Sequence, residues 1–383
     1  MLDPIVAFFQ RIFSAIGRGI GTVIAWILWP FITVTNWYRA RGWIIKGPIG
    51  IALLLLVGFY AYFIWQTQVW SGFNTDYVNT YNFAQRKQDA GVASTGAAAT
   101  TPAAGEVTEP EPKTCVRSAI VDVTADLIDL NVNQNAWISS MLLYKLGFFG
   151  MEWDKTPWFD NKASFQRGIN QAVRRTAVEL VDSLGRVRGT SGINADLQRA
   201  RGSIQFDEET WYFRSNSLLP TTPTPNYYRA ARTDLQKFNT SLEACEAIFD
   251  GRSDNLIEFL DRIANDIGST SAIIRERSEF HNGGWFDTRA DDRFWFAYGQ
   301  LYGYYGILSA AGADFDAVIK ARGIEPLWVE SIKQLRSALN IQPAIISNGR
   351  EDGWIMPTHL PTMGFYILRV RSNLVEMRDV LAR

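Results

Sequence analysis

The chain is poor in the residue types that most often carry enzyme chemistry. Its 383 residues include two histidines and two cysteines, so the commonest general base and metal ligand is scarce. Neither His281 nor His359 stands in a metal-binding motif, and the cysteines lack the spacing of a zinc site. No nucleophile motif of the G-x-S-x-G type occurs. We therefore expect no metal and no cofactor, and an enzyme is the less favoured reading.

The distribution of charge does not favour nucleic acid as a partner. Residues 1–75 contain five basic residues and one acidic residue, which leaves 33 basic and 38 acidic residues in the rest of the chain. That longer part shows no concentrated basic face of the kind that nucleic-acid-binding domains present. The basic N-terminal part suits contact with anionic lipid instead.

One long stretch contains no ionised side chain at all, from after Lys46 to before Asp76. Its core, PIGIALLLLVGFYAYFIW, is long enough at about 1.5 Å per residue to cross a hydrocarbon layer of about 30 Å. Aromatic residues flank this core at both ends, as they do in interfacial belts: Trp37, Tyr38, Trp43, Tyr60, Tyr62, Trp65 and Trp70. The sequence predicts a transmembrane helix at residues 47–70, with the lipid bilayer as a partner.

Positive charge predicts the orientation of this helix. Arg39, Arg41 and Lys46 directly precede it, whereas the next basic residue after it is Arg86. Basic flanks stay in the cytoplasm, so residues 1–46 are expected there and the C-terminal part on the other side. No small-residue cleavage site follows the apolar core, which favours an uncleaved signal anchor.

The first 46 residues allow two readings. Apolar residues recur at helical spacing from Ile5 to Ile16, opposite polar residues such as Gln10 and Arg11, which indicates an amphipathic interfacial helix. Gly19 to Tyr38 is also free of charge and could form a second span, although Pro30 interrupts it. We favour a single span. The location of the C-terminal part is the same in both readings.

The rest of the chain divides into a linker and a large body. Residues 71–113 are expected to form a short juxtamembrane helix and then a flexible tether, since Asp89–Lys113 has no aromatic residue and is rich in Ala, Thr, Gly, Pro and Glu. Residues 114–383 show helical periodicity without alternating strands, so the fold class is predicted to be all-α. Helices are expected near 163–188, 227–249, 255–277, 291–310, 326–339 and 362–381, while 202–213 and 341–356 could hold short strands.

The two cysteines, Cys115 and Cys245, both follow the predicted span. In an oxidising compartment they could pair, and closing a loop of about 130 residues would contribute on the order of 5 kcal/mol in the chain-entropy model. They could equally be two buried thiols that act as small apolar side chains.

A group of carboxylates provides the candidate site. Asp287, Asp291 and Asp292 lie close in sequence to Trp285 and Trp295. A pair of carboxylates suffices for glycan cleavage, and aromatic rings bind sugars. The alternative reading is structural, because acidic residues are favoured at a helix start and the aromatics can pack in a core. The motif WFDNKA at 158–163 recurs as WFDTRA at 285–290, either through duplication or as two N-caps with a hydrophobic staple.

Three stretches resemble an uncharacterised bacterial membrane family, domain-of-unknown-function family 2333. They are GWIIKGPIGIALLLLVGFYAYFIWQTQVW, WFDNKASFQRGINQ and MPTHLPTMGFYILRVRSNLVEMRDVL. The resemblance implies a single-span inner-membrane protein of Gram-negative bacteria, with the body in the periplasm. It implies no activity and no catalytic residues.

These features favour a non-catalytic scaffold or adaptor of the cell envelope, held at the membrane and bound to another envelope protein. The alternative is a module that binds or cleaves peptidoglycan or another glycan with the carboxylates Asp287–Asp292.

Overall fold

The computed structural model describes the chain except for residues 1–20, 23–24, 87–114, 187–191 and 214–218. The chain divides into two compact units, Met1–Phe63 and Ile64–Arg383. The predicted amphipathic helix near Ile5–Ile16 and the predicted tether Asp89–Lys113 lie outside the described residues.

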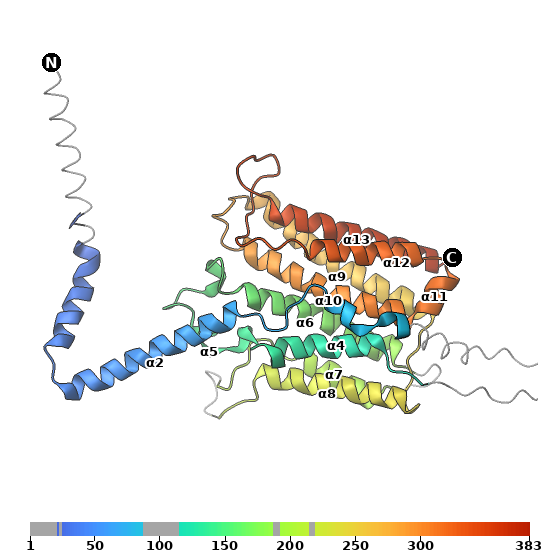
Figure 1. Cartoon of the computed structure of the whole chain (residues 1–383), viewed down its shortest axis with the longest axis horizontal. Coiled ribbons are helices and arrows are strands. Elements are labelled where there is room, and N and C mark those ends of the chain that lie inside the picture. Colours follow the sequence, from blue (N-terminus) through green and yellow to red (C-terminus); the bar gives the residue numbers. More distant parts are fainter. Residues whose placement is uncertain (1–20, 23–24, 87–114, 187–191, 214–218) are drawn as a thin grey trace, which may run out of the picture. The chain divides into compact units, whose positions relative to one another are not determined.

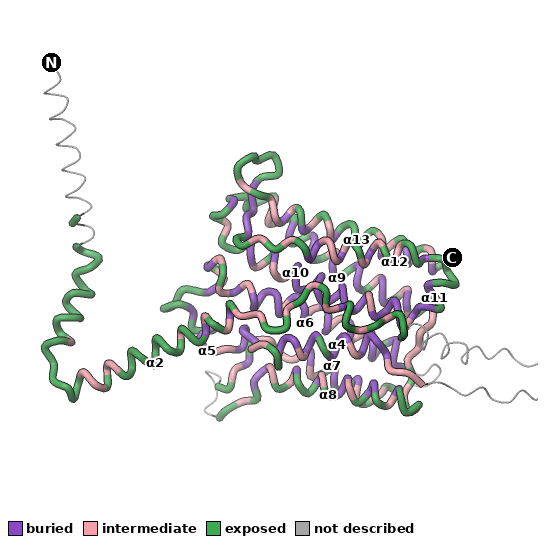
Figure 2. Tube along the Cα trace, in the orientation of Figure 1, coloured by how far each residue is buried: buried purple, intermediate pink, exposed green. Residues whose placement is uncertain are grey.

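Helix α2, Trp43–Gln68, covers residues 47–68 of the predicted span 47–70. Among the described residues it is the one helix long and apolar enough to cross a membrane. Its middle exposes apolar side chains, with Leu54 74% and Val57 65% exposed (Figure 2). Lipid satisfies such a surface and water does not. Residues 25–39 are helical too, but the alternative second span Gly19–Tyr38 includes residues that are not described.

The unit Ile64–Arg383 is a bundle of helices (Figure 1). The prediction of an all-α fold is confirmed, since its described residues contain isolated bridges and no strand. The stretch 341–356, which could have held a strand, forms only bridges through Asn348. The helices are α4 Ala119–Asp129, α5 Leu142–Leu146, α6 Asn161–Glu179, α7 Ala195–Ile204, α8 Thr224–Glu243, α9 Ser253–Phe280, α10 Ala290–Asp314, α11 Asp316–Ala321, α12 Glu325–Ala338 and α13 His359–Leu381.

Helix α10 is the centre of this bundle. It packs against α4, α6, α9, α12 and α13, and buried residues run along its whole length (Figure 2). Its sequence is apolar or aromatic on every side, which is the pattern of a fully buried helix. The largest of its fully buried side chains are Tyr298, Tyr302 and Tyr304.

Helices α6 and α10 approach each other closely because glycines line their contact. A Cβ atom on Gly299 would stand against the backbone carbonyl of Phe165, and one on Gly168 against the backbone of Phe296. One turn further along, a Cβ on Gly303 would lie 2.8 Å from Cβ of Ala172. The matching order of these contacts shows that the two helices run parallel, so both begin at the same end of the bundle.

A buried carboxylate joins three of the central helices. Asp266 of α9 is 5% exposed and accepts hydrogen bonds from Tyr304 Oη at 2.6 Å and Gln300 Nε2 at 2.7 Å, both on α10. Its other oxygen accepts from Gln171 Nε2 of α6 at 2.7 Å. Buried polar groups stabilise a core when they are satisfied in this way.

The two ends of the bundle differ in their connections. Helices α6, α8, α10 and α13 begin, and α7, α9 and α12 end, at the end where α2 also ends (Figure 1). Gln68, the last residue of α2, donates a hydrogen bond to Trp158 O at 3.0 Å just before α6. We call this end the anchor end and the opposite one the far end.

A disulfide closes the far end. Cys115, just before α4, is joined to Cys245, just after α8, with their Cα atoms 5.3 Å apart. Asp314, the last residue of α10, accepts hydrogen bonds from the backbone N–H groups of Ala119 and Ile120 at 2.8 and 2.9 Å and so caps the start of α4.

Candidate functional site

The first predicted site residue, Asp287, serves a structural ion pair. It lies in the connection 281–289 between α9 and α10, and its side chain is 1% exposed. Arg277 Nε donates to its two oxygens at 3.1 and 3.0 Å, and Asn348 Nδ2 donates to Oδ2 at 2.9 Å. Burial by itself would raise the pKa of Asp287, but these hydrogen bonds lower it below its ordinary value. The carboxylate is ionised, paired and closed to a glycan.

The other two predicted carboxylates belong to a separate cluster at the start of α6 and α10. Asp291 is 3% exposed, and Asp292 accepts a hydrogen bond from Ser164 Oγ at 3.0 Å. Asp160, which precedes α6, is fully buried beside them and makes no side-chain cap hydrogen bond to its helix. With its amide oriented to suit both neighbours, Asn161 donates to Asp291 Oδ2 at 3.1 Å and accepts from Trp295 Nε1 at 3.3 Å.

Burial keeps protons on this cluster. Burial and then the nearby Asp292 and Asp291 carboxyls raise the pKa of Asp160. Burial and then Asp292 raise the pKa of Asp291 to about 8. Buried carboxyls close to each other cannot all ionise, so Asp160 carries a proton at neutral pH. The cluster is a proton-sharing core element.

This protonation predicts a stability that depends on pH. The folded-state pKa values of Asp160 and Asp291 lie above the ordinary 3.8, so the stability that the bound protons contribute is complete below about pH 4 and is lost as pH rises through the folded pKa. Asp160→Asn replaces the protonated carboxyl with a neutral amide. We expect it to raise the free energy of unfolding near pH 7.5 by on the order of 2–4 kcal/mol and to have little effect near pH 4.

The measurement is urea unfolding of the full chain in mild detergent across this pH range. Asp287→Asn is the matched control, and it is expected to change the free energy of unfolding in the opposite direction. Its carboxylate is ionised and paired with Arg277, so the substitution should destabilise the protein at neutral pH. Equal effects of the two variants, or a pH-independent effect of Asp160→Asn, would contradict the assignment.

The two tryptophans predicted for the site lie in different surroundings. Trp295 is partly buried and contacts Trp70 and Tyr298, with ring centroids 5.1 and 5.2 Å apart. Trp285 is 54% exposed on the connection 281–289. The structure therefore joins Asp291 and Trp295 through Asn161, places Asp292 in the same cluster beside Asp160, and leaves Asp287 and Trp285 outside that group.

The most unusual polar contact at the anchor end involves Lys162, in the first turn of α6. It is 2% exposed, and its ammonium donates to Gln66 O at 2.8 Å and Val69 O at 2.6 Å. These carbonyls lie in the last turn of α2 and directly after it, where a cation is favoured by the helix dipole. Burial lowers the pKa of Lys162 to about 8, so the residue is still largely charged at neutral pH. A buried cation therefore fastens the end of α2 to α6.

The chain that follows, residues 69–86, lies along the bundle and is here called the strap (Figure 1). At its start the Trp70 ring stacks on Phe165, with centroids 4.9 Å apart. In its middle Tyr77 stacks on Tyr302 at 4.6 Å, and its hydroxyl donates to Tyr302 O at 2.8 Å. Tyr302 in turn donates to Asn74 O at 3.0 Å. The strap thus packs on α10 through aromatic rings and hydrogen bonds.

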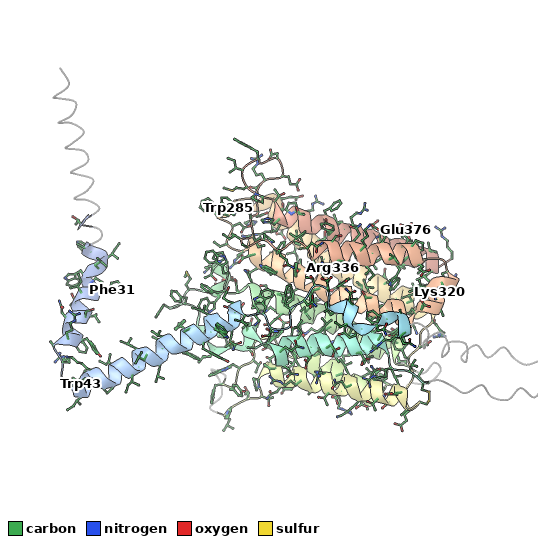
Figure 3. All side chains as sticks on the ribbon, in the orientation of Figure 1. Phe31, Trp43, Trp285, Lys320, Arg336 and Glu376 are labelled. Atoms are coloured by element: carbon green, nitrogen blue, oxygen red, sulfur yellow. A yellow bond between two sulfur atoms is a disulfide. The ribbon has the colours of Figure 1, made fainter. Side chains whose placement is uncertain are left out.

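Ion pairs also join the strap to the bundle. Asp76 pairs with Arg336 of α12 at 2.8 Å, and Figure 3 labels this arginine. At the end of the strap, Arg86 pairs with Asp122 of α4 at 2.8 Å. Arg117, which follows Cys115, pairs with the same carboxylate at 2.8 Å. The chain before and after the predicted tether therefore meets on one carboxylate, and the body includes residues that precede the tether.

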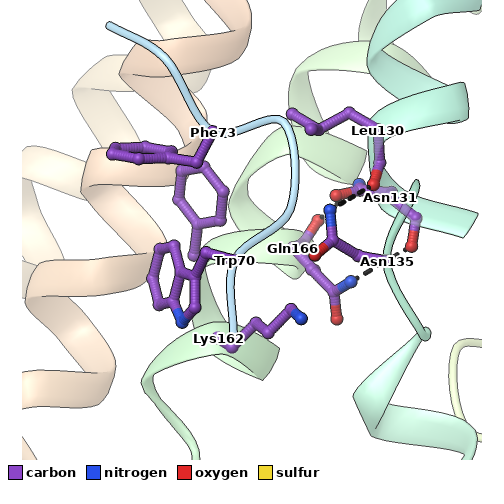
Figure 4. Close-up of a pocket in the computed structure, with 8 residues that line it drawn as sticks. Trp70, Phe73, Leu130, Asn131, Asn135, Lys162 and Gln166 are labelled. Atoms are coloured by element: carbon purple, nitrogen blue, oxygen red, sulfur yellow. Dashed lines mark hydrogen bonds between the residues drawn. The ribbon is translucent and has the colours of Figure 1, made fainter. Parts of the chain in front are cut away.

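A small hollow lies beneath the start of the strap (Figure 4). Asn131 and Gln166 close one side of it, since each side-chain amide donates to the backbone carbonyl of the other residue at 3.1 Å. With the adjoining solvent included, it measures about 220 Å³, below the usual range for an organic ligand. The hollow suits ordered water beside Lys162. It is lined by Trp70, Phe73, Leu130, Asn131, Asn135, Lys162, Phe165 and Gln166.

The two histidines take part in backbone hydrogen bonds of the connections around them. His359 Nδ1 accepts a hydrogen bond from the Ser347 backbone N–H at 2.9 Å, and burial lowers its pKa. His281 contributes its backbone carbonyl, which accepts from Asn348 Nδ2 at 3.0 Å. Within the described ranges, no three His, Cys, Asp or Glu side chains are grouped to hold a metal ion.

Sequence reasoning missed Lys162 and considered Asp160 only as a helix cap. One signal was available, because Asp160 is the last residue of the repeated WFD motif that precedes a helix and Lys162 follows that motif. The pairing of Lys162 with α2 links residues about a hundred positions apart, which no local pattern shows.

A family model described as an uncharacterised protein conserved in bacteria, domain-of-unknown-function family 2333, matches residues 107–282 and 274–383. Comparison with curated proteins found no match, and neither did comparison with solved structures. The matched segments include α4 to α13, the disulfide and the carboxylate cluster, and begin after α2 and the strap. They cover well over half of the chain, which therefore belongs to this bacterial family.

Proposed function

We propose that this protein is a non-catalytic scaffold or adaptor of the bacterial cell envelope, anchored in the inner membrane by α2 with its N-terminus in the cytoplasm and its helical body in the periplasm. The observation that carries the proposal is the attachment of the body to the end of α2. Lys162, Trp70 and Tyr77 bind the chain that leaves α2 to the core helices α6 and α10. Such an attachment keeps the body next to its anchor in the chain and suits the presentation of a surface.

The compartment is supported by two independent features. Arg39, Arg41 and Lys46 precede α2, which favours a cytoplasmic N-terminus. The Cys115–Cys245 disulfide suits an oxidising compartment such as the periplasm and is rare in the cytosol.

The glycan alternative has less support from the geometry. Its carboxylates would need to reach a sugar from two sides of a bond. Asp287 is paired with Arg277, and Asp291 is buried at 3% exposure. The exposed Trp285 remains a surface to which a sugar could bind, so the test includes peptidoglycan as a ligand.

An exposed apolar pair on α13 provides the place for a probe. Phe365 and Leu368 are 56% and 52% exposed one turn apart. A photo-crosslinking amino acid at Phe365 in the full chain, expressed in a Gram-negative cell, should capture a specific envelope protein. The same probe at Lys320 of α11, an exposed residue at the far end (Figure 3), should not capture that protein.

Retention of the purified full chain on isolated peptidoglycan is measured in parallel. The scaffold proposal predicts a crosslinked partner at Phe365 and no retention. Retention on peptidoglycan together with identical crosslinking at both positions would overturn it in favour of the glycan alternative.

A further inference from the structure

The anchor end of the bundle exposes large apolar side chains on three separate connections. Phe149 on the connection 147–160 is 74% exposed, and Phe286 on the connection 281–289 is 83% exposed. Trp354 on the connection 339–358 is 93% exposed, with Ile355 beside it at 68%. Figure 3 shows Trp285, a neighbour of Phe286, at this end of the bundle.

The far end lacks a comparable surface among its described residues. Its large exposed apolar side chains outside helices are Ile193 and Ile248, 38% and 48% exposed. Because exposed apolar side chains normally occur singly on a soluble surface, their concentration at the anchor end requires an apolar or interfacial partner.

Two of these connections, 281–289 and 339–358, are held together by a buried residue. Asn348 is fully buried and bridges Gly284, whose N–H donates to Asn348 O at 2.9 Å. Its amide donates to the carbonyl of His281 at 3.0 Å and to Asp287 Oδ2 at 2.9 Å. Two connections thus share one buried polar residue, and their outer apolar side chains are presented on a fixed base.

The charges on these connections largely neutralise one another. Arg289 pairs with Asp154 at 3.0 Å, Arg350 with Asp352 at 2.9 Å, and Lys155 with Glu152 at 3.2 Å. The surface therefore offers apolar side chains and ion pairs instead of a cationic patch. Contact through it should depend on apolar insertion and little on anionic lipid or salt.

We propose that the anchor end of the body docks on the bilayer, with Phe149, Phe286 and Trp354 inserted at the lipid–water interface. Lipid is the occupant because the chain enters the bundle at this end directly from the apolar helix α2, through Gln66 and Gln68. Trp and Phe are residue types that lie well at the headgroup level. The inference rests on the proposed membrane anchoring by α2 and not on the scaffold role.

The test uses the full chain reconstituted in vesicles of zwitterionic phosphatidylcholine. A fluorescent label that is sensitive to polarity is placed at Phe286→Cys or Trp354→Cys, while the native cysteines remain in their disulfide. Val329→Cys, on an exposed apolar residue near the start of α12 at the far end, is the matched control. Lipids that carry a nitroxide near the headgroup then quench labels at the interface. Resistance of the protein to alkaline extraction reports anchoring separately.

Quenching is expected to be several-fold stronger at residues 286 and 354 than at residue 329, and unchanged by salt. Equal and weak quenching at all three positions in protein that resists extraction would overturn docking and leave anchoring intact. A label at residue 286 could instead be buried against protein, and its burial would then increase with protein density and persist in detergent. That result would assign the surface to a second copy and also overturn the proposal. Loss of the protein on extraction would remove the anchoring on which the inference rests.

Discussion

Substitution of Gly299 with alanine is expected to lower the free energy of unfolding by about 3 kcal/mol or more. The added methyl group would meet the backbone carbonyl of Phe165, which cannot move without separating α6 from α10. These two parallel helices carry the central contact of the bundle. The Asp160 cluster lies at the start of both helices and Lys162 lies in the first turn of α6, so their separation would loosen the attachment of α2 as well. Urea unfolding of the full chain in detergent measures the change.

Gly202→Ala is the matched control for this prediction. Gly202 lies in α7, and a Cβ at this position meets nothing within 4 Å. Alanine has the higher helix propensity, so a small stabilisation of up to about 1 kcal/mol is expected. If Gly299→Ala behaved like Gly202→Ala, the close parallel packing of α6 and α10 would be wrong.

Removal of the disulfide is expected to have the second large effect on stability. Cys245→Ser is expected to cost about 2–5 kcal/mol, since the bridge closes a loop of 130 residues and constrains the unfolded chain. The folded geometry should change little, because Asp314 holds the start of α4 through separate hydrogen bonds. The loss is measured as a shift in the urea midpoint under oxidising conditions.

Cys115→Ser and the double substitution serve as controls. Either single change breaks the same bridge, so all three variants should show the same loss and no additivity. Addition of a reductant should shift the unmodified protein and leave the variants unaffected. A double variant that loses twice as much as each single variant would show that the cysteines act separately.

The helical body was largely predictable from the sequence, because periodicity is a local property. The expected helices at 227–249, 255–277, 291–310, 326–339 and 362–381 overlap α8, α9, α10, α12 and α13. Helix α10 could be recognised as buried because its aromatic and small residues leave no polar face.

The site was less accessible to sequence reasoning, since its interactions join distant residues. Asp291 and Asp292 were singled out, but Asp160, whose pKa burial and these two carboxyls raise, is about 130 positions away in the sequence. Asp287 was grouped with them by proximity, whereas Arg277 and Asn348 draw it into another network. Which carboxylates share a proton depends on helix packing and not on spacing in the chain.

The packing of the strap was also not predictable from the sequence, because its contacts join distant residues. A short juxtamembrane helix was predicted here, and the described residues form a 3₁₀ turn at Tyr77–Tyr81 and a helical turn at 83–86. Phe73, Tyr77 and Tyr81 were not singled out. Their rings find partners on α4 and α10 instead, as in the hydrogen bond from Tyr81 to Asp126. Tertiary packing outweighs the local preference here. The consequence for function is that the body is attached ahead of the tether and not through it.

One measurement tests this attachment most directly. A site for a specific protease is inserted within residues 89–113, and the full chain with an N-terminal affinity tag is cleaved in detergent, where adhesion to a bilayer cannot hold the pieces together. The disulfide lies entirely within the C-terminal fragment and cannot link the two. The fragment from residue 114 onward is expected to stay bound to the tagged fragment under native conditions and to separate in urea. Release of the C-terminal fragment upon cleavage alone would show that the body hangs on the tether, and would contradict the account.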